Sequence, residues 1–296
     1  MKAKKTRGRA RKAPAPIRSI SARKTVRLLL ARFPGQQQEH PESTDLYVDL
    51  VDRARRDPRV EQVLRWKLSD TPITMSRNRC LREAVEAQAD IVIMLDADIG
   101  AHAGSENFYD IAMDFLVGAE RPSIIGAPYC GPLPASGVYV FEWTNQGNPG
   151  VVNYPDLKLE MIRREDAARR RGIQEVAALP TGLIAIDMRA ITGFPHPETG
   201  QAVSVPIPWF YYEWKDQYHT EKASTEDVVF TRNASLVGCP VYCAWNAWVT
   251  HHKLTGIERP EPWDPRMVAD NYRDVMQNGS ADQLMFLPPA RDRLRE

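Results

Sequence analysis

The chain has 296 residues, of which 43% are hydrophobic, so it can bury a core for one large domain or two small ones. Its formal net charge of +1 at pH 7 argues against a protein that binds nucleic acid through its overall charge. No apolar run reaches the roughly 18 residues of a membrane span, and the basic start lacks the apolar segment of a signal peptide.

Residues 1–22 are rich in Lys and Arg and contain no acid. They predict a disordered basic arm, because they cannot bury enough apolar surface to fold alone. Such an arm suits contact with nucleic acid or an anionic membrane, but a solubilising tail or a misassigned start codon is the simpler interpretation.

The cysteines show neither a disulfide framework nor a zinc-binding spacing; they are Cys80, Cys130, Cys239 and Cys243. This pattern indicates a reducing environment. We therefore expect a cytoplasmic protein, in the host cytoplasm if a bacteriophage encodes it.

Strands that alternate with helices predict an α/β fold with a mainly parallel sheet flanked by helices. The strands are expected at 25–33, 60–67, 91–95, 123–129, 181–191 and 240–245. The helices are expected at 44–57, 77–88 (capped by Thr74 or Ser76), 108–119, 158–179, 225–237 and 267–278. The stretch 194–224 has no clean period and predicts a long functional loop.

Two acids follow the buried strand 91–95, in the order Asp96-Ala97-Asp98. Ligands of a parallel α/β sheet bind beyond the carboxyl ends of its strands, so both acids are expected at the functional edge. Two neighbouring carboxylates favour a hard divalent cation between them, such as Mg²⁺ or Mn²⁺. Two exposed loop acids are the alternative.

The helix 77–88 leads back into that strand, so its first turn, with Arg77 and Asn78, is expected at the same edge. A helix N-terminus attracts phosphate, and arginine adds a bidentate contact. The alternative is a solvated arginine beside a helix cap.

The helix 225–237 repeats this geometry in front of the strand 240–245. Glu226 or Asp227 in its first turn is a candidate general base, and plain helix capping is the alternative. One of His251 and His252, which follow the strand, is a candidate metal ligand, although such a pair is more often a surface feature.

These motifs occur in order in "TMSRNRCLREAVEAQADIVIMLDADIG", "LPTGLIAIDMRAI", and "PWF" followed by "STEDVVFTRNASLVGCPVYCAWNAWVTHH". Together they resemble a glycosyltransferase with the GT-A fold, in the large inverting family that includes cellulose and chitin synthases. The resemblance covers residues 70–252. It implies a Rossmann-like GT-A domain at 23–256. The tail 257–296 has no clear match in the family, and its amphipathic segment 267–278 predicts a helical extension that packs on the domain.

The resemblance also implies roles for the site residues. The ligands of the Mn²⁺ or Mg²⁺ ion would be Asp96, Asp98 and His251. The nucleotide-diphosphate sugar donor would contact Arg77, Asn78, Asp96, Thr181, Gly182, Trp209 and Phe210, and the aromatic pair would stack on a sugar face. Asp227 would be the general base, with Glu226 beside it.

The chain departs from this family at "LLLARFPGQQQEHPE", where a loop that binds the nucleobase is expected. The acceptor stays open between a saccharide or lipid-linked saccharide and the hydroxylated bases of phage DNA. A nucleotidyltransferase and a non-catalytic nucleotide-sugar-binding module remain alternatives. Without a membrane span, a processive membrane synthase is not expected.

Overall fold

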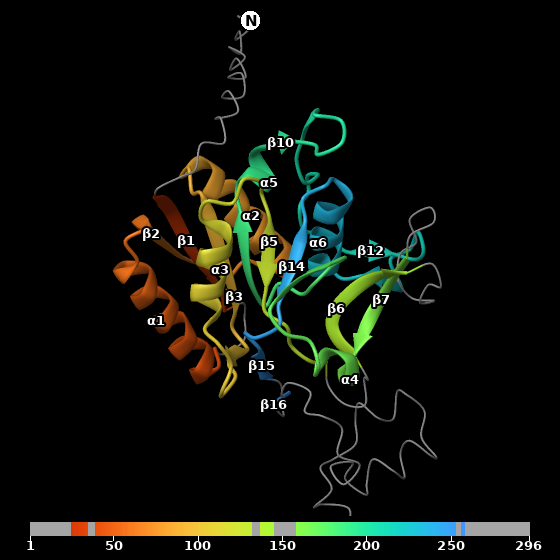
Figure 1. Ribbon diagram of the computed structural model, residues 1–296. Coiled ribbons are helices and arrows are strands. Elements are labelled where there is room, and N and C mark those ends of the chain that lie inside the picture. Colours follow the sequence, from red (N-terminus) through yellow and green to blue (C-terminus); the bar gives the residue numbers. More distant parts are fainter. Residues whose placement is uncertain (1–24, 35–38, 132–136, 145–157, 253–255, 258–296) are drawn as a thin grey trace, which may run out of the picture.

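The computed structural model describes residues 25–34, 39–131, 137–144, 158–252 and 256–257. Its centre is a seven-stranded sheet in the order β2-β1-β3-β9-β5-β14-β8 (Figure 1). The strands are β1 Val26–Phe33, β2 Val60–Lys67, β3 Ile91–Asp96, β5 Ile124–Gly126, β8 Ile173–Val176, β9 Leu183–Asp187 and β14 Val241–Ala244. All run in one direction except β8 and β9, which are antiparallel to their neighbours, so the predicted mainly parallel sheet is confirmed.

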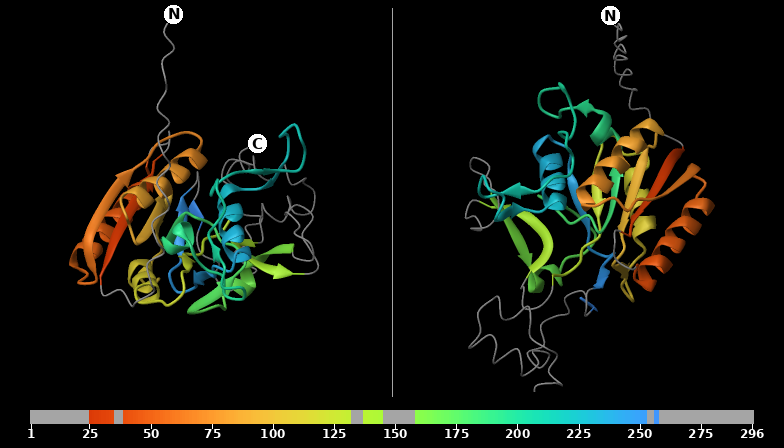
Figure 2. Two further views of the ribbon diagram at one scale, coloured as in Figure 1. Left: turned by 90° about the horizontal axis from the view of Figure 1, so that it is seen from above. Right: turned by 180° about the vertical axis from the view of Figure 1, so that it is seen from behind.

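Helices cover both faces of this sheet, as Figures 1 and 2 show. The longer helices are α1 Pro41–Arg56, α2 Ile73–Glu86, α3 Phe108–Leu116 and α6 Glu226–Leu236, and the short ones are α4 Arg164–Ala167 and α5 Arg189–Thr192. On β1, Leu28 and Leu30 belong to the core that includes residues of α1 and α3, whereas Leu29 belongs to the core that includes residues of α2 and α6. Successive strand residues point to opposite faces, so these continuous apolar strands supply two cores at once.

Smaller sheets lie around the central sheet. β4 Ile99–Ala101, β15 Val249–His252 and β16 Gly256–Ile257 form one sheet at the lower edge in Figure 1. β6 Gly137–Thr144 pairs with β7 Lys158–Arg163. The stretch 194–224 is mostly loop, with the short pairs β10 Phe194–Pro195 with β11 Ala202–Val203 and β12 Glu213–Trp214 with β13 Lys222–Ser224.

The expected helix at 158–179 is wrong, because this segment forms β7, α4 and β8. Leu159 and Ile162 are buried at a spacing of three, which resembles a helical pattern. The spacing arises in a strand because the β6–β7 register shifts between Val138 and Phe141, which breaks the period of two.

The expected start and cap of the helix 77–88 are also wrong. α2 begins at Ile73, and its cap residue Pro72 makes no side-chain hydrogen bond. Ser76 lies inside the helix, where its hydroxyl donates to the carbonyl of Asp70 (2.9 Å). Arg77 therefore lies in the second turn, too far along for the free N–H groups of the helix start to contribute.

The basic arm 1–22 and the helix 267–278 of the extension 257–296 lie outside the described residues and stay predictions. The four cysteines are buried free thiols, and burial raises the pKa of Cys239 to about 12. Within the described segments, no helix has the length and apolarity needed to cross a membrane.

Candidate functional site

The Asp96-Ala97-Asp98 turn connects β3 with β4 at the carboxyl end of the parallel strands. The backbone N–H of Asp96 donates to the carbonyl of Gly182 (2.8 Å), which leads into the antiparallel strand β9. A Cβ atom on Gly182 would lie 2.8 Å from Tyr129 and 2.9 Å from Ile99. Glycine is therefore needed at this position for β9 to pass so close to the acidic turn.

Arg77 of α2 connects this turn with α6. Its guanidinium donates to both carboxylate oxygens of Asp96 (2.9 and 2.7 Å) and to Oε1 of Glu226 (2.8 Å). Arg77 is only 3% exposed, and its guanidinium carbon lies 5.7 Å from the centre of the Phe210 ring. The site thus contains a buried ion triad that joins two predicted motifs.

Burial and charge act against each other in this triad. Burial raises the pKa of Asp96 and Arg77 lowers it; with the added effect of Asp98 and Asp227, the pKa lies above its ordinary value. Burial likewise raises the pKa of Glu226 against the opposing effect of Arg77. Burial alone would lower the pKa of Arg77, but the surrounding carboxylates outweigh it and raise that pKa. The carboxylates outnumber the guanidinium, so the site favours a further cation.

Asp98 and His251 form a second pair of polar groups beside the triad. Nε2 of His251, on β15, lies 3.2 Å from Oδ2 of Asp98, and both side chains are largely buried. The His251 ring packs edge-on against Tyr129 (4.8 Å between ring centres). An imidazole nitrogen and a carboxylate oxygen at this separation fit two ligands of one divalent ion, Mn²⁺ better than Mg²⁺ because of the nitrogen.

Asn78 makes its contacts with protein backbone. Its side-chain amide donates to the carbonyl of Phe210 (2.7 Å) and accepts from the N–H groups of Trp209 (3.0 Å) and Phe210 (3.2 Å). The Phe210 ring is 1% exposed and stacks on Phe230 (4.4 Å), so protein already occupies the face that the resemblance assigned to a sugar. Asn78 therefore holds the loop that leads to α6.

Two other residues that are predicted to contact the sugar donor each have a buried polar atom. The hydroxyl of Thr181 and the indole N–H of Trp209 are buried, and neither has a hydrogen-bond partner in the described part of the chain. Both residues belong to segments that border the acidic site through Gly182 and Phe210. Their contact with a donor stays a prediction.

Asp227 lies in the first turn of α6, next to Glu226. Its Oδ1 accepts hydrogen bonds from the hydroxyl of Thr225 and from the backbone N–H of Val228 (2.9 Å). Its neighbour Glu226 is joined through Arg77 to Asp96, so the first turn of α6 borders the turn that follows β3.

Sequence reasoning missed three tyrosines at this site. Burial and nearby carboxylates raise the pKa values of Tyr129, Tyr139 and Tyr212, and Tyr212 also makes a hydrogen bond with Glu226. In the sequence, only their position near predicted motifs could have pointed to these tyrosines. That position does not distinguish them from the other tyrosines among the ten in the chain.

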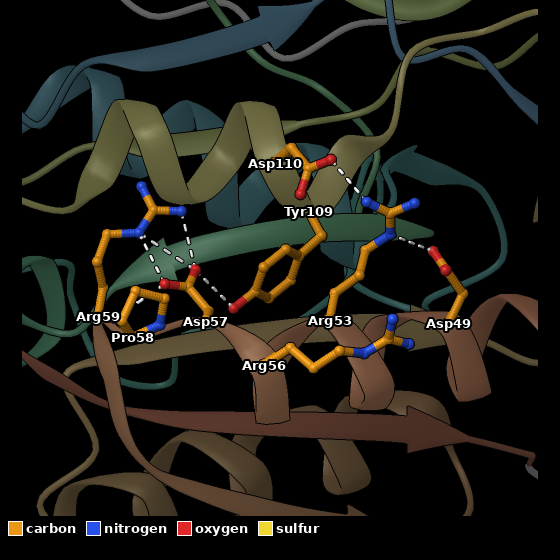
Figure 3. Close-up of a pocket in the computed structure, with 8 residues that line it drawn as sticks. All are labelled: Asp49, Arg53, Arg56, Asp57, Pro58, Arg59, Tyr109 and Asp110. Atoms are coloured by element: carbon orange, nitrogen blue, oxygen red, sulfur yellow. Dashed lines mark hydrogen bonds and ion pairs between the residues drawn. The ribbon is translucent and has the colours of Figure 1, made fainter.

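A separate open pocket lies between α1 and α3, away from these residues (Figure 3). Carboxylates already pair with its arginines: Arg53 contacts Asp49 (2.8 Å) and Asp110 (2.7 Å), and Arg59 contacts Asp57 (2.8 Å). We interpret this pocket as a junction between two helices and not as a binding site.

No protein-family model matches the chain, and no curated protein matches it. Among solved structures, A197 from STIV is similar over 77% of this chain and 86% of its own, with 13% identity and a TM-score of 0.45. HddC from Yersinia pseudotuberculosis is similar in its complex with GMP-PN (57% and 80% covered, 9% identity, TM-score 0.27) and in a second structure (75% and 92% covered, 8% identity, TM-score 0.31). Likeness at this level carries no argument about function.

Proposed function

We propose that the chain is a metal-dependent inverting glycosyltransferase with a GT-A fold, which transfers a sugar from a nucleotide-diphosphate sugar to an acceptor hydroxyl. One observation carries the proposal: Asp98 contacts His251, and Arg77 joins Asp96 to Glu226 beside Asp227, although these residues come from separate parts of the chain. The antiparallel strand β9 beside β3 and the close approach at Gly182 support the same proposal.

Asp98 and His251 would hold the Mn²⁺ or Mg²⁺ ion, which when bound neutralises negative charge on the leaving diphosphate. Asp96 turns both carboxylate oxygens towards Arg77, so its role would be contact with the sugar or ribose and at most weak metal binding. Arg77 would act as a positioning residue, because it fixes Asp96 and Glu226 in one arrangement.

Asp227 is the proposed general base. The hydrogen bonds of Thr225 and Val228 both reach Oδ1, which leaves Oδ2 to take the proton of the acceptor hydroxyl. As that oxygen forms its bond to the anomeric carbon from the opposite face, the bond to the diphosphate oxygen breaks and the nucleoside diphosphate leaves. A saccharide or a lipid-linked saccharide is the proposed acceptor.

The test begins with a thermal-shift screen of nucleotide sugars in the presence of Mn²⁺, followed by transfer assays with the donor that stabilises the chain. Asp227→Asn should keep donor binding and lower turnover about 10²- to 10⁴-fold, because only proton removal is lost. Asp98→Ala should remove the metal-dependent part of donor binding in calorimetry. The control is Asp45→Asn, which changes an exposed acid of α1.

Retained turnover in Asp227→Asn would contradict the base assignment, and unchanged Mn²⁺-dependent binding in Asp98→Ala would contradict the metal site. A nucleotidyltransferase would instead release pyrophosphate from a nucleoside triphosphate and a sugar phosphate. A non-catalytic binding module would bind the donor without hydrolysing or transferring it.

A further inference from the structure

Three potential metal ligands lie close together next to the Asp96–Asp98 turn, outside the proposed glycosyltransferase site. His40 precedes α1, Glu42 lies in the first turn of α1, and His252 ends β15. Their ligand atoms lie within 4.8 Å of one another. His251 and His252 are successive strand residues and point to opposite sides, so His251 faces Asp98 while His252 faces this second group.

The contact between His252 and Glu42 is close but is not a hydrogen bond. Nε2 of His252 lies 2.9 Å from Oε2 of Glu42, yet this buried nitrogen has no hydrogen-bond partner of acceptable geometry among the described residues. Two ligands of one zinc ion, each about 2.0–2.1 Å from the metal, lie roughly 3 Å apart. The separation therefore suits two atoms that share an ion.

His40 completes the group. Its ring stacks on the ring of His252, with 3.7 Å between ring centres and 8° between planes. Its only side-chain hydrogen bond in the described segments is a long one, from the N–H of Glu42 to Nδ1 (3.4 Å). One of its ring nitrogens lies within 4.8 Å of the ligand atoms of Glu42 and His252, so binding a common ion requires the ring to move closer to them.

Gly100 leaves open the space beside the group. A Cβ atom at this position would lie 2.7 Å from Nε2 of His252 and 2.9 Å from Oε2 of Glu42. Any other residue would therefore push these two ligand atoms apart.

We propose that His40, Glu42 and His252 bind one transition-metal ion of the Zn²⁺ type, and that this ion is structural. Two imidazole nitrogens with one carboxylate oxygen form a known Zn²⁺ ligand set, in which water takes the fourth position, and they suit borderline transition metals better than Mg²⁺. The structural role is inferred from the backbone contacts of the ligands and not from the ligand set. The site is separate from the Asp98–His251 pair, and the proposal does not depend on glycosyl transfer.

The backbone around these ligands shows what the ion stabilises. The N–H of His40 donates to the carbonyl of Ala97 (2.9 Å), and the N–H of His252 donates to the carbonyl of Asp98 (2.7 Å). The start of α1 and the end of β15, which contain the ligands, are therefore each hydrogen-bonded to the Asp96–Asp98 turn. An ion between them fixes the turn by joining α1 to β15.

The experiment uses the full chain without an affinity tag, after treatment with a chelator, and titrates Zn²⁺ by calorimetry. Glu42→Gln and Gly100→Ala should each weaken binding of one Zn²⁺ ion at least tenfold, the first by removing a ligand charge and the second by filling the space. Zn²⁺ should raise the thermal midpoint of the parent chain by more than that of these variants, which keep only the Asp98–His251 pair. The controls are His219→Ala, which removes a histidine elsewhere, and Asp98→Ala, which alters the neighbouring site; both should keep this binding event.

Equal Zn²⁺ affinity in the parent chain, Glu42→Gln and Gly100→Ala would overturn the proposal and leave a plain ion pair between His252 and Glu42. Loss of the Zn²⁺ binding event in Asp98→Ala, with no loss in Glu42→Gln, would assign it to the Asp98–His251 pair and would overturn the proposal as well.

Discussion

The guanidinium of Arg77 lies between Asp96 and Glu226, with almost no exposure to solvent. Ion pairs of this kind gain little net stability over apolar packing, because removing the charges from water offsets their attraction. Removing one member is costly, however, since it leaves the others charged, buried and unpaired.

Arg77→Ala should therefore lower the free energy of unfolding at pH 7 by about 3–5 kcal/mol, measured by urea denaturation. The matched control is Arg79→Ala on the same helix, whose exposed side chain pairs with Glu83 and Asp70, and its loss should be much smaller. Equal losses in the two variants would show that Arg77 does not neutralise a buried group.

The pH dependence of this difference has a definite sign. The folded-state pKa values of Asp96 and Glu226 are raised above 3.8 and 4.5, so these groups favour folding at low pH and lose that contribution as the pH rises through the folded values. Without Arg77 both pKa values should rise further. The stability difference between parent and Arg77→Ala should thus shrink on acidification and grow towards neutral pH.

For individual residues, the sequence predicts which side chains lie at the carboxyl edge of the sheet better than it predicts which of them contact one another. Asp98 contacts His251, and Arg77 joins Asp96 to Glu226, because strand ends and helix starts converge at one edge. The roles of these residues stay predictions. The pairing of Arg77 with Glu226 joins residues 149 positions apart, and no local pattern encodes it. The pattern of residues alone left His251 and His252 open, and the resemblance favoured His251, which is the histidine that contacts Asp98.

At the scale of elements, α1 meets α3 through Asp57, which follows α1. Its side chain, 6% exposed, accepts hydrogen bonds from Arg59 and from the hydroxyl of Tyr109 (Figure 3). Burial raises the pKa of Asp57, but these hydrogen bonds outweigh burial and lower it. Asp57 therefore stabilises the fold above its ordinary pKa of 3.8, and the contribution is lost as the pH falls.

Asp57→Asn should lower the free energy of unfolding by about 1–3 kcal/mol at pH 7, because hydrogen bonds to a charged group are weakened. The difference from the parent should narrow in denaturation curves recorded below pH 3.8. Asp52→Asn serves as the control, since its pair with Arg56 is exposed and 3.9 Å long. A constant difference at all pH values would mean that the charge of Asp57 is not responsible.

Elements with long apolar runs were predictable, and those that depend on a distant partner were not. β1, β2, β3 and β14 lie where the sequence places them, since each has a continuous or alternating apolar pattern. β7 was mistaken for a helix because its pairing with β6 fixes it as a strand and a register shift hides the strand period.

At the scale of the whole molecule, the α/β class followed from the alternation of elements, but the sheet order did not. β9 enters between β3 and β5 and runs against both, although 87 residues separate Asp96 from Leu183. All five residues of β9 are buried, as they would be in a parallel or an antiparallel strand at this place. The sequence pattern therefore does not indicate the direction of β9.

Deleting residues 1–22 tests the contribution of the basic arm. If hydroxylated DNA bases are the acceptor, the full chain should retard DNA in a gel-shift assay and the deletion should abolish this binding, because phosphate contacts need the positive charge. The thermal midpoint should stay unchanged. Arg169→Ala, a change in the run of three arginines at 169–171, is the control and should keep the retardation. DNA binding that survives the deletion would place the contact elsewhere on the chain.

The triad around Arg77 has a consequence for engineering. Glu226 belongs to the helix that would serve the acceptor, and Asp96 to the turn that would serve the donor, yet one arginine is counter-ion to both. A chimera that imports a foreign segment over residues 194–227 to change acceptor choice must carry a carboxylate to the position of Glu226. Without that carboxylate, Arg77 in the chimera would keep only Asp96 as a partner. A replacement made to change the acceptor would then also disturb the residues proposed to bind the donor.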